Sequence, residues 1–242
     1  MNQSLTLEKA FVLHTRPYRE TSLLMDFFTQ HKGRMTLLAK GIKRSKQIAL
    51  LAQPFIPLMI AWRGKGELPV LHTIDVGASP IRLEAMSLWC GLYLNELLVR
   101  LLSHQDVHED IFSLYENTLL ALAQDRSYRE GKNTFLQQVI LRLFEQEFLE
   151  KMGYALPLTH VFNTHHPIQP NQYYRYIPHQ GFLAIDCLER ESPNVFQGEH
   201  LSAIACHQYH SVEVLRAAKK LMRLALAPLL GDRPLKSQEV FL

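Results

Sequence analysis

The first third of the chain alternates short apolar runs with polar turn residues, a pattern typical of β-strands. Five such runs precede residue 77, at 10–15, 21–29, 34–41, 55–62 and 68–76. The segments between them contain the Gly, Pro and charged residues of hairpin connections. Five short strands in so short a stretch predict a small closed barrel. The oligonucleotide-binding OB-fold is the first candidate, and an SH3-like barrel is the alternative.

After Val76 the apolar spacing becomes helical. Ser79 and Pro80 have the residue types of an N-cap and a first helical position, so a helix is expected over 80–103. In it, Asn95 and Glu96 are expected to pair inside a helical core. Further helices are expected at 107–124, 133–152, 199–208 and 211–229, and a hairpin between 173–177 and 181–188.

The predicted fold class is therefore α+β. A five-stranded OB-fold barrel is expected at 1–79, followed by a mostly helical domain at 80–242 with a hairpin insertion around 157–190. The composition, 47% apolar and 20% charged, is that of a folded globular chain. No apolar run is long enough for a membrane span, no signal peptide is apparent, and three widely spaced cysteines suit a reducing compartment. The sequence thus predicts a cytoplasmic protein without disulfides or membrane contact.

Charge is distributed unevenly along the chain. Residues 1–80 contain 11 Lys or Arg against 5 Asp or Glu, whereas residues 81–242 contain 15 against 18. A loop between two expected strands carries four cations and no acid, namely Lys40, Lys43, Arg44 and Lys46. Cations on one rim of a barrel bind phosphates by releasing condensed counterions. Arg34, Arg63 and Lys65 extend this predicted DNA-binding surface, and Tyr18 and Trp62 are the aromatic candidates for stacking on bases.

The last long helix carries a second group of cations. Arg216, Lys219, Lys220 and Arg223 follow the spacing i, i+3, i+4, i+7 and are expected to form an outward cationic stripe. Leu215, Met222, Leu226 and Leu229 are expected on the opposite, docked side of the helix. A solvated helix face is the alternative interpretation.

Motifs for cofactors, metals and catalysis are missing from the sequence. There is no P-loop, GxGxxG, GxSxG or HExxH pattern, and no cofactor is expected. His160, His165, His166, His179 and Cys187 match no standard zinc module, and Cys206 with His210 supplies only two ligands, so no metal is expected. A metal-dependent nuclease needs clustered carboxylates, and the first 80 residues have five scattered acids.

Three stretches resemble the bacterial RecO family of recombination mediators in DNA repair. They are AFVLHTRPYRETSLLMDFFTQHKGRMTLLAKGIKRSK (10–46), GLYLNELLVRLL (91–102) and LRAAKKLMRLALAPLLGDRPLKSQEVF (215–241). They occur in the family's order and span nearly the whole chain. The resemblance implies an N-terminal OB-fold barrel and a helical C-terminal domain.

The resemblance also implies a function without catalysis. RecO proteins bind single- and double-stranded DNA, anneal complementary strands, and help load RecA onto DNA coated with single-stranded DNA-binding protein. They act with RecR and, in many bacteria, with RecF, which implies a nucleoid-associated location. The basic loop and Arg34 match positions where the family contacts DNA. A protein-interaction adaptor whose basic loop is merely solvated is the alternative function.

RecO proteins also bind the acidic, Phe-ending tail of the single-stranded DNA-binding protein. Arg142 matches a family basic position near that site, with Leu143 and Phe144 as candidate lining residues. Lys219, Lys220 and Arg223 are further candidates. Many relatives carry four zinc-binding cysteines, whereas the corresponding region here contains only Cys187, so the chain resembles the zinc-less branch.

Overall fold

The structure is a computed structural model that describes residues 6–41, 46–64, 66, 68–125, 134–186, 191–233 and 235–237. Two compact units are present: Met1–Arg126 together with Leu235–Leu242, and Ser127–Pro234. The barrel therefore shares its unit with the two helices that follow it, although the sequence pattern changes near residue 79. Within the described ranges, no helix is both long and apolar enough to cross a membrane.

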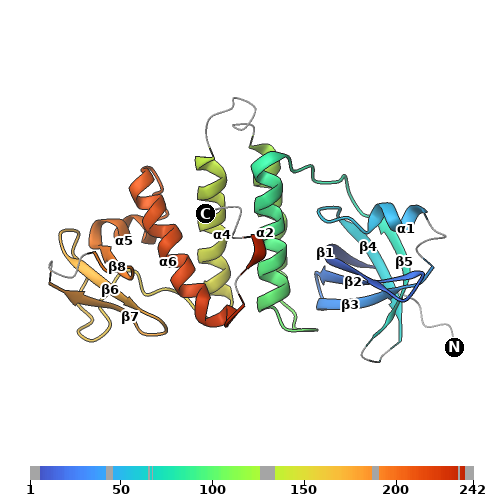
Figure 1. Cartoon of the computed structure of the whole chain (residues 1–242), viewed down its shortest axis with the longest axis horizontal. Coiled ribbons are helices and arrows are strands. Elements are labelled where there is room, and N and C mark those ends of the chain that lie inside the picture. Colours follow the sequence, from blue (N-terminus) through green and yellow to red (C-terminus); the bar gives the residue numbers. More distant parts are fainter. Residues whose placement is uncertain are drawn as a thin grey trace. The chain divides into compact units, whose positions relative to one another are not determined.

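The first unit contains a closed five-stranded barrel, which confirms the predicted OB-type architecture (Figure 1). Its spatial order is β1-β2-β3-β5-β4. The inward-facing residues form an apolar core that includes Met25, Phe27 and Leu37, and α1 adds Leu51 to it. The elements are β1 (Glu8–Tyr18), β2 (Ser22–Thr29), β3 (Gly33–Ala39), α1 (Lys46–Leu51), β4 (Leu58–Arg63) and β5 (Val70–Val76).

Two irregularities shape one side of the barrel. Among the described residues, β3 joins β5 through a single parallel pair, Leu38 with Val70. The first half of β3 is therefore not paired with β5 in the ladder. In β4 the register with β5 shifts between Ala61 and Trp62, which marks a β-bulge.

Helices α2 (Ala85–Leu101) and α3 (Glu109–Gln124) cover part of the barrel's outer surface. Phe11 of β1 lies 5.3 Å from Tyr115 of α3, measured between ring centroids, in an edge-to-face arrangement. Phe28 of β2 lies 5.3 Å from Phe112. All four rings are buried, so this aromatic cluster fixes α3 against β1 and β2.

Helix α2 starts later than the sequence predicts. The expected N-cap at Ser79 and first turn at Pro80 are non-helical, and Glu84 is the N-cap instead. Ile81 explains the difference, because its N–H donates to the carbonyl of Phe55 at 2.9 Å and its side chain is buried. The segment is held extended along the barrel by this contact, and the helix begins only after it.

In its described part, the second unit contains three helices and a three-stranded sheet. Strands β6 (Tyr173–Ile177) and β7 (Gly181–Ile185) form the predicted hairpin. The short β8 (Val195–Gln197) pairs with the other side of β6 and was not predicted from the sequence. The helices are α4 (Phe135–Lys151), α5 (Gly198–Ala205) and α6 (Val212–Leu230), all close to their predicted ranges. Both α4 and α5 pack against α6.

The segment 235–237 follows the second unit in sequence but belongs to the first. Leu235 is buried, and the backbone N–H groups of Lys236 and Ser237 each donate to the Glu96 carboxylate at 2.9 Å. Asn95 is buried and hydrogen-bonded in the core, as expected, whereas Glu96 is only partly buried and binds this segment instead. The two side chains leave α2 in different directions, Asn95 into the barrel contact and Glu96 to this segment.

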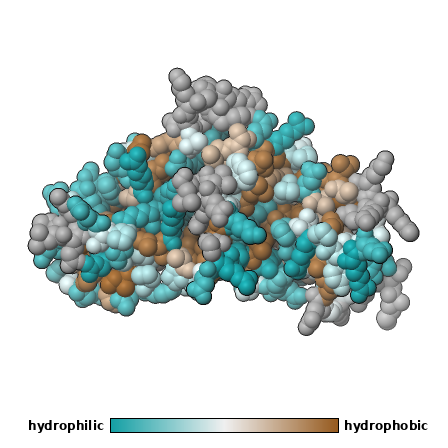
Figure 2. Space-filling view, viewed as in Figure 1, coloured by the Kyte–Doolittle hydropathy of each residue, from teal (hydrophilic) through white to brown (hydrophobic). Residues whose placement is uncertain are grey.

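Helix α2 also presents apolar side chains at the surface. Leu88 and Trp89 are 38% and 44% exposed, and hydrophobic residues gather along α2 in the space-filling view (Figure 2). Substitution of Trp89 therefore disturbs little of the core.

Candidate nucleic-acid interface

One end of the β1-β2-β3 surface combines cations with an aromatic side chain. Tyr18 pairs with Ser22, and Leu23 pairs with Ala39, the residue before Lys40. Tyr18 and Lys40 therefore lie at the same end of the three strands. Arg19 lies 5.3 Å from the centroid of the Tyr18 ring, and Lys40 and Arg19 are both exposed. We call this group, together with the exposed Arg16, the strand-end patch.

Part of the predicted basic loop lies outside the described residues. Lys43 and Arg44 lie outside the described residues, and so does Lys65 of the β4–β5 loop. Lys46 opens α1, but its side chain is not described. Of the four loop cations, Lys40 is the one whose exposure the structure gives, and it is directed to solvent.

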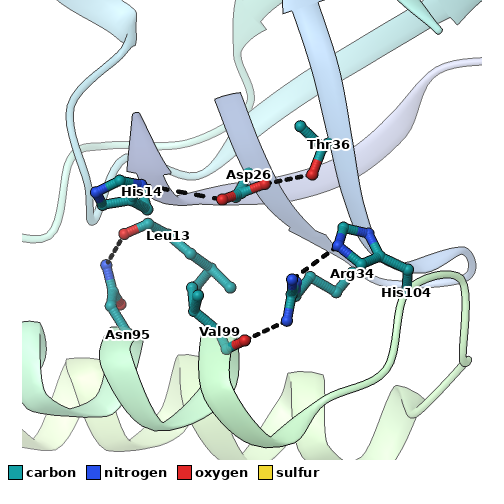
Figure 3. A network of polar contacts seen from close by, with 8 residues as sticks. All are labelled: Leu13, His14, Asp26, Arg34, Thr36, Asn95, Val99 and His104. Carbon is teal, nitrogen blue, oxygen red and sulfur yellow. Dashed lines mark hydrogen bonds and ion pairs between the residues drawn. The ribbon is translucent and has the colours of Figure 1, made fainter. Parts of the chain in front are cut away.

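Arg34, expected among the DNA contacts, is instead engaged within the protein (Figure 3). Its Nη1 donates to the carbonyls of Val99 and Leu102, the latter at 2.9 Å, where α2 ends. Its Nη2 lies 2.7 Å from Nε2 of His104, which must accept because a guanidinium only donates. A cation at a helix C-terminus is stabilised by the helix dipole. Burial lowers the pKa of Arg34, and both of its Nη atoms are bound within the protein.

A second polar contact fastens α2 to β1. The Asn95 amide donates to the carbonyl of Leu13 at 3.0 Å, and the Tyr115 hydroxyl donates to Asn95 Oδ1 at 2.6 Å (Figure 3 shows the first). Asn95 is 3% exposed, and burial raises the pKa of Tyr115 strongly. In OB-folds the surface of strands 2 and 3 is the usual nucleic-acid site. Here α2 and α3 occupy the Phe28–Arg34 end of that surface, which leaves the strand-end patch exposed.

Trp62 and Arg63 lie at the other predicted contact region. They end β4, where Trp62 is partly buried against the barrel core and Arg63 is exposed. Trp62 lines a cleft of about 390 Å³ together with Met35, Gly64, Gly66 and Pro69. The remaining lining residues are His31, Lys32, Gln105 and Val107. Sequence reasoning missed these four because they come from two other loops and carry no motif.

In the second unit, α4 and α6 bring together several of the predicted partner-binding residues. Arg142 is 8% exposed, its Nη2 donates to Glu145 at 2.7 Å, and its Nε has no partner among the described residues. Burial lowers the pKa of Lys219, and the neighbouring charges of Arg223 and Arg142 lower it further. The repulsion among these three cations is partly offset by Glu145, which raises the pKa of Lys219.

Two other predicted residues make contacts within the protein. Phe144 is buried and stacks on Phe148 at a centroid distance of 5.5 Å, so it supports α4 from within. Lys220 was expected in an outward stripe, but its Nζ donates to the carbonyl of Val195 at 2.9 Å and lies 4.7 Å from the Phe196 ring centroid. Leu143 is partly exposed, and Arg216 is the fully outward member of the α6 cations.

The histidines considered as metal ligands do not gather in the described part of the second unit. Across the described residues, no three His, Cys, Asp or Glu side chains form a group able to hold a metal ion. Cys187 lies outside those residues.

Comparison with known proteins identifies the family over nearly the whole chain. The family model described as Recombination protein O N terminal matches residues 1–79, and Recombination protein O C terminal matches residues 84–239. A DNA repair protein RecO from Coxiella burnetii (strain CbuG_Q212) is 38% identical over 242 residues, covering 99% of both chains. Another, from Cellvibrio japonicus (strain Ueda107), is 40% identical over 97% of this chain and 96% of its own length. The chain therefore belongs to the RecO family of DNA repair proteins.

Proposed function

We propose that the chain binds single- and double-stranded DNA and anneals complementary strands. With RecR, and with RecF where it is present, it helps load RecA onto DNA coated with single-stranded DNA-binding protein. The observation that carries this proposal is the full-length family match, joined to a barrel whose exposed strand-end patch is cationic. The chain acts through binding and partner exchange, without bond chemistry, in the cytoplasm at the nucleoid.

The annealing mechanism is electrostatic. The DNA-binding residues are Lys40, Lys43, Arg44 and Lys46 with the neighbouring Tyr18, and Trp62, Arg63 and Lys65 at the β4–β5 side. Cations that contact the phosphates of two strands lower the repulsion that opposes their pairing. Arg19 and Arg16, exposed beside Tyr18, extend the same surface.

The second unit is proposed to bind the tail of the single-stranded DNA-binding protein. Lys219 and Arg223 on α6 would receive its carboxylates, with Arg142 as a buried positive charge behind them and Leu143 as an apolar contact. The lowered pKa of Lys219 supports this role, since burial and the neighbouring cations Arg223 and Arg142 outweigh the opposite effect of Glu145. Phe144 and Lys220 have structural contacts and contribute indirectly.

The DNA proposal is tested by fluorescence anisotropy of a labelled single strand across a salt series. A variant with Lys40, Lys43, Arg44 and Lys46 changed to Ala is compared with wild type and with an equal change of charge on α6 at Arg216, Lys219, Lys220 and Arg223. If the loop binds DNA, its variant has a slope of log K against log salt shallower by up to about 3, at about 0.7 per lost contact. Weak, salt-insensitive binding by the wild type would favour the adaptor function instead.

The tail proposal is tested with a labelled peptide of the tail sequence. Lys219→Ala and Arg223→Ala should each weaken peptide binding, whereas Arg216→Ala, an exposed cation one turn away, serves as the matched control. Arg142→Ala is unsuitable, because it leaves Glu145 buried without its 2.7 Å partner and is expected to cost about 3–5 kcal/mol of stability. Equal binding by all variants would contradict the proposed tail site.

A further inference from the structure

The cleft beside Trp62 lies where the barrel ladder is interrupted. Among the described residues β3 meets β5 at Leu38 and Val70, so the first half of this edge of β3 has no β5 partner, and Arg34 forms an isolated bridge with His104 of the α2–α3 loop instead. The Leu38 N–H donates to the Pro69 carbonyl at 2.9 Å, and this hydrogen bond anchors the β4–β5 loop to the second half of β3. The resulting cleft has a volume of about 390 Å³.

Residues of β3 and of the β4–β5 loop line two sides of the cleft, and the α2–α3 loop lines a third. Gln105 donates its N–H to the carbonyl of Arg34 at 2.8 Å, so the loop is fastened to the start of β3. At Gly33 the approach is closer still, because a Cβ there would lie 2.0 Å from the carbonyl oxygen of Asp106. Gln105 and Val107 are thus fixed at the mouth of the cleft.

Trp62 supplies an aromatic surface to this cleft. The bulge between Ala61 and Trp62 changes the direction of the strand, a device that re-aims side chains near functional sites. Trp62 packs partly against the barrel core and also lines the cleft. Its indole is therefore held in place before any ligand binds, which reduces the entropy lost on stacking.

The other lining residues combine apolar surface with positive charge. Met35, Pro69 and Val107 are apolar, Lys32 is a cation, and among the described lining residues none is acidic. The His31 Nδ1 is 3.0 Å from Glu8 Oε1, and Glu8 also accepts from the His31 N–H at 2.7 Å. These bonds fix the β2–β3 turn that carries Lys32.

We propose that this cleft holds one unpaired nucleobase of a DNA strand, stacked on the Trp62 indole, with Lys32 beside the adjoining phosphate. The volume is at the lower end of small-ligand pockets, which suits one base rather than a stack of bases. The proposal rests on the proposed DNA binding and adds a preference to it. A base paired inside a duplex is not available to the cleft, so the site selects single strands.

The test uses Trp89→Phe protein, in which Trp62 is the sole tryptophan, since the chain has two. Its tryptophan emission is recorded while a short oligothymidylate is added, and anisotropy of a labelled copy reports binding independently. The matched probe is an abasic strand of the same length, which keeps the phosphates but has no bases. A fully paired duplex is the third probe.

The expected result is a fall in Trp62 emission with oligothymidylate and none with the abasic strand or the duplex, although all three bind. In the otherwise wild-type protein, Trp62→Ala should weaken oligothymidylate binding about 10-fold and leave the abasic strand unaffected. Trp89→Ala, which removes the exposed tryptophan on α2, should leave the affinity for both strands unchanged. The emission experiment needs no change at Trp62, so it decides the matter even if Trp62→Ala fails to fold.

Two other results would overturn the proposal in distinguishable ways. If oligothymidylate binds without a change in Trp62 emission, or the abasic strand changes it equally, the cleft holds no base and the DNA-binding function stands. If none of the probes binds, the DNA-binding function itself fails and the cleft proposal fails with it. A fall in emission caused by the tail peptide in that case would assign the cleft to a protein partner.

Discussion

Replacing Arg34 with Met is expected to destabilise the first unit without changing how DNA affinity depends on salt. The guanidinium donates to the Val99 carbonyl and, at 2.9 Å, to the Leu102 carbonyl at the end of α2. Hydrogen bonds from charged groups contribute about 1.5–3 kcal/mol each, and partial exposure favours the lower value. Losing both is therefore expected to lower the free energy of unfolding by about 3 kcal/mol. Met keeps most of the apolar stem, so little packing is lost.

Urea unfolding followed by tryptophan fluorescence measures this effect in the correct part of the chain. Trp62 and Trp89 both belong to the first unit, so their emission reports the unfolding of that unit. Arg16→Met is the matched control, because Arg16 is an exposed cation of β1 and its loss should change stability by less than about 0.5 kcal/mol. The m-value should be the same in both variants.

The anisotropy salt series on the same proteins separates the two roles of Arg34. If Arg34→Met unfolds at the wild-type urea concentration and has a salt slope shallower by about 0.7, the side chain contacts DNA and the capping argument is refuted. A loss of stability with an unchanged slope supports the structural role.

Three further predictions concern contacts within the first unit. Asn95→Ala leaves the buried Tyr115 hydroxyl without an acceptor and should cost about 2–4 kcal/mol in urea unfolding, of which Tyr115→Phe in the same protein restores part. Burial tends to raise the pKa of Glu96, but hydrogen bonds from Ser237 outweigh it and the pKa is lowered. The stability that the Glu96 carboxylate contributes is therefore present above its unfolded-state pKa and is lost as pH falls through its folded-state pKa. In urea titrations below about pH 5, the free energy of unfolding should fall less in Glu96→Gln than in wild type. Gly33→Ala requires a side chain at φ 67° and against a loop carbonyl, and should lower the melting temperature by more than about 5 °C.

The barrel and most helices follow from local pattern. Alternating residues such as Met25 and Phe27 predict an inward face, and the period change after Val76 predicts helices, because these periods reflect geometry within single elements. The start of α2 could not be predicted from this local pattern. Ser79 and Pro80 favour a helix locally, but the bond from Ile81 to Phe55, a residue distant in sequence, keeps the segment extended.

The sequence by itself determined the barrel, the mostly helical region after it, the basic character of the first 80 residues and the family. It did not determine which cations are exposed to solvent and which form hydrogen bonds within the protein. Arg34 and Lys40 lie in one run of sequence, yet Arg34 is bound to α2 carbonyls and Lys40 is exposed. The cleft at Trp62 was also decided only by tertiary structure, because its walls come from three loops that the barrel brings together. Local periodicity records burial within one element, whereas a hydrogen-bond partner or a cavity depends on which distant elements pack against it.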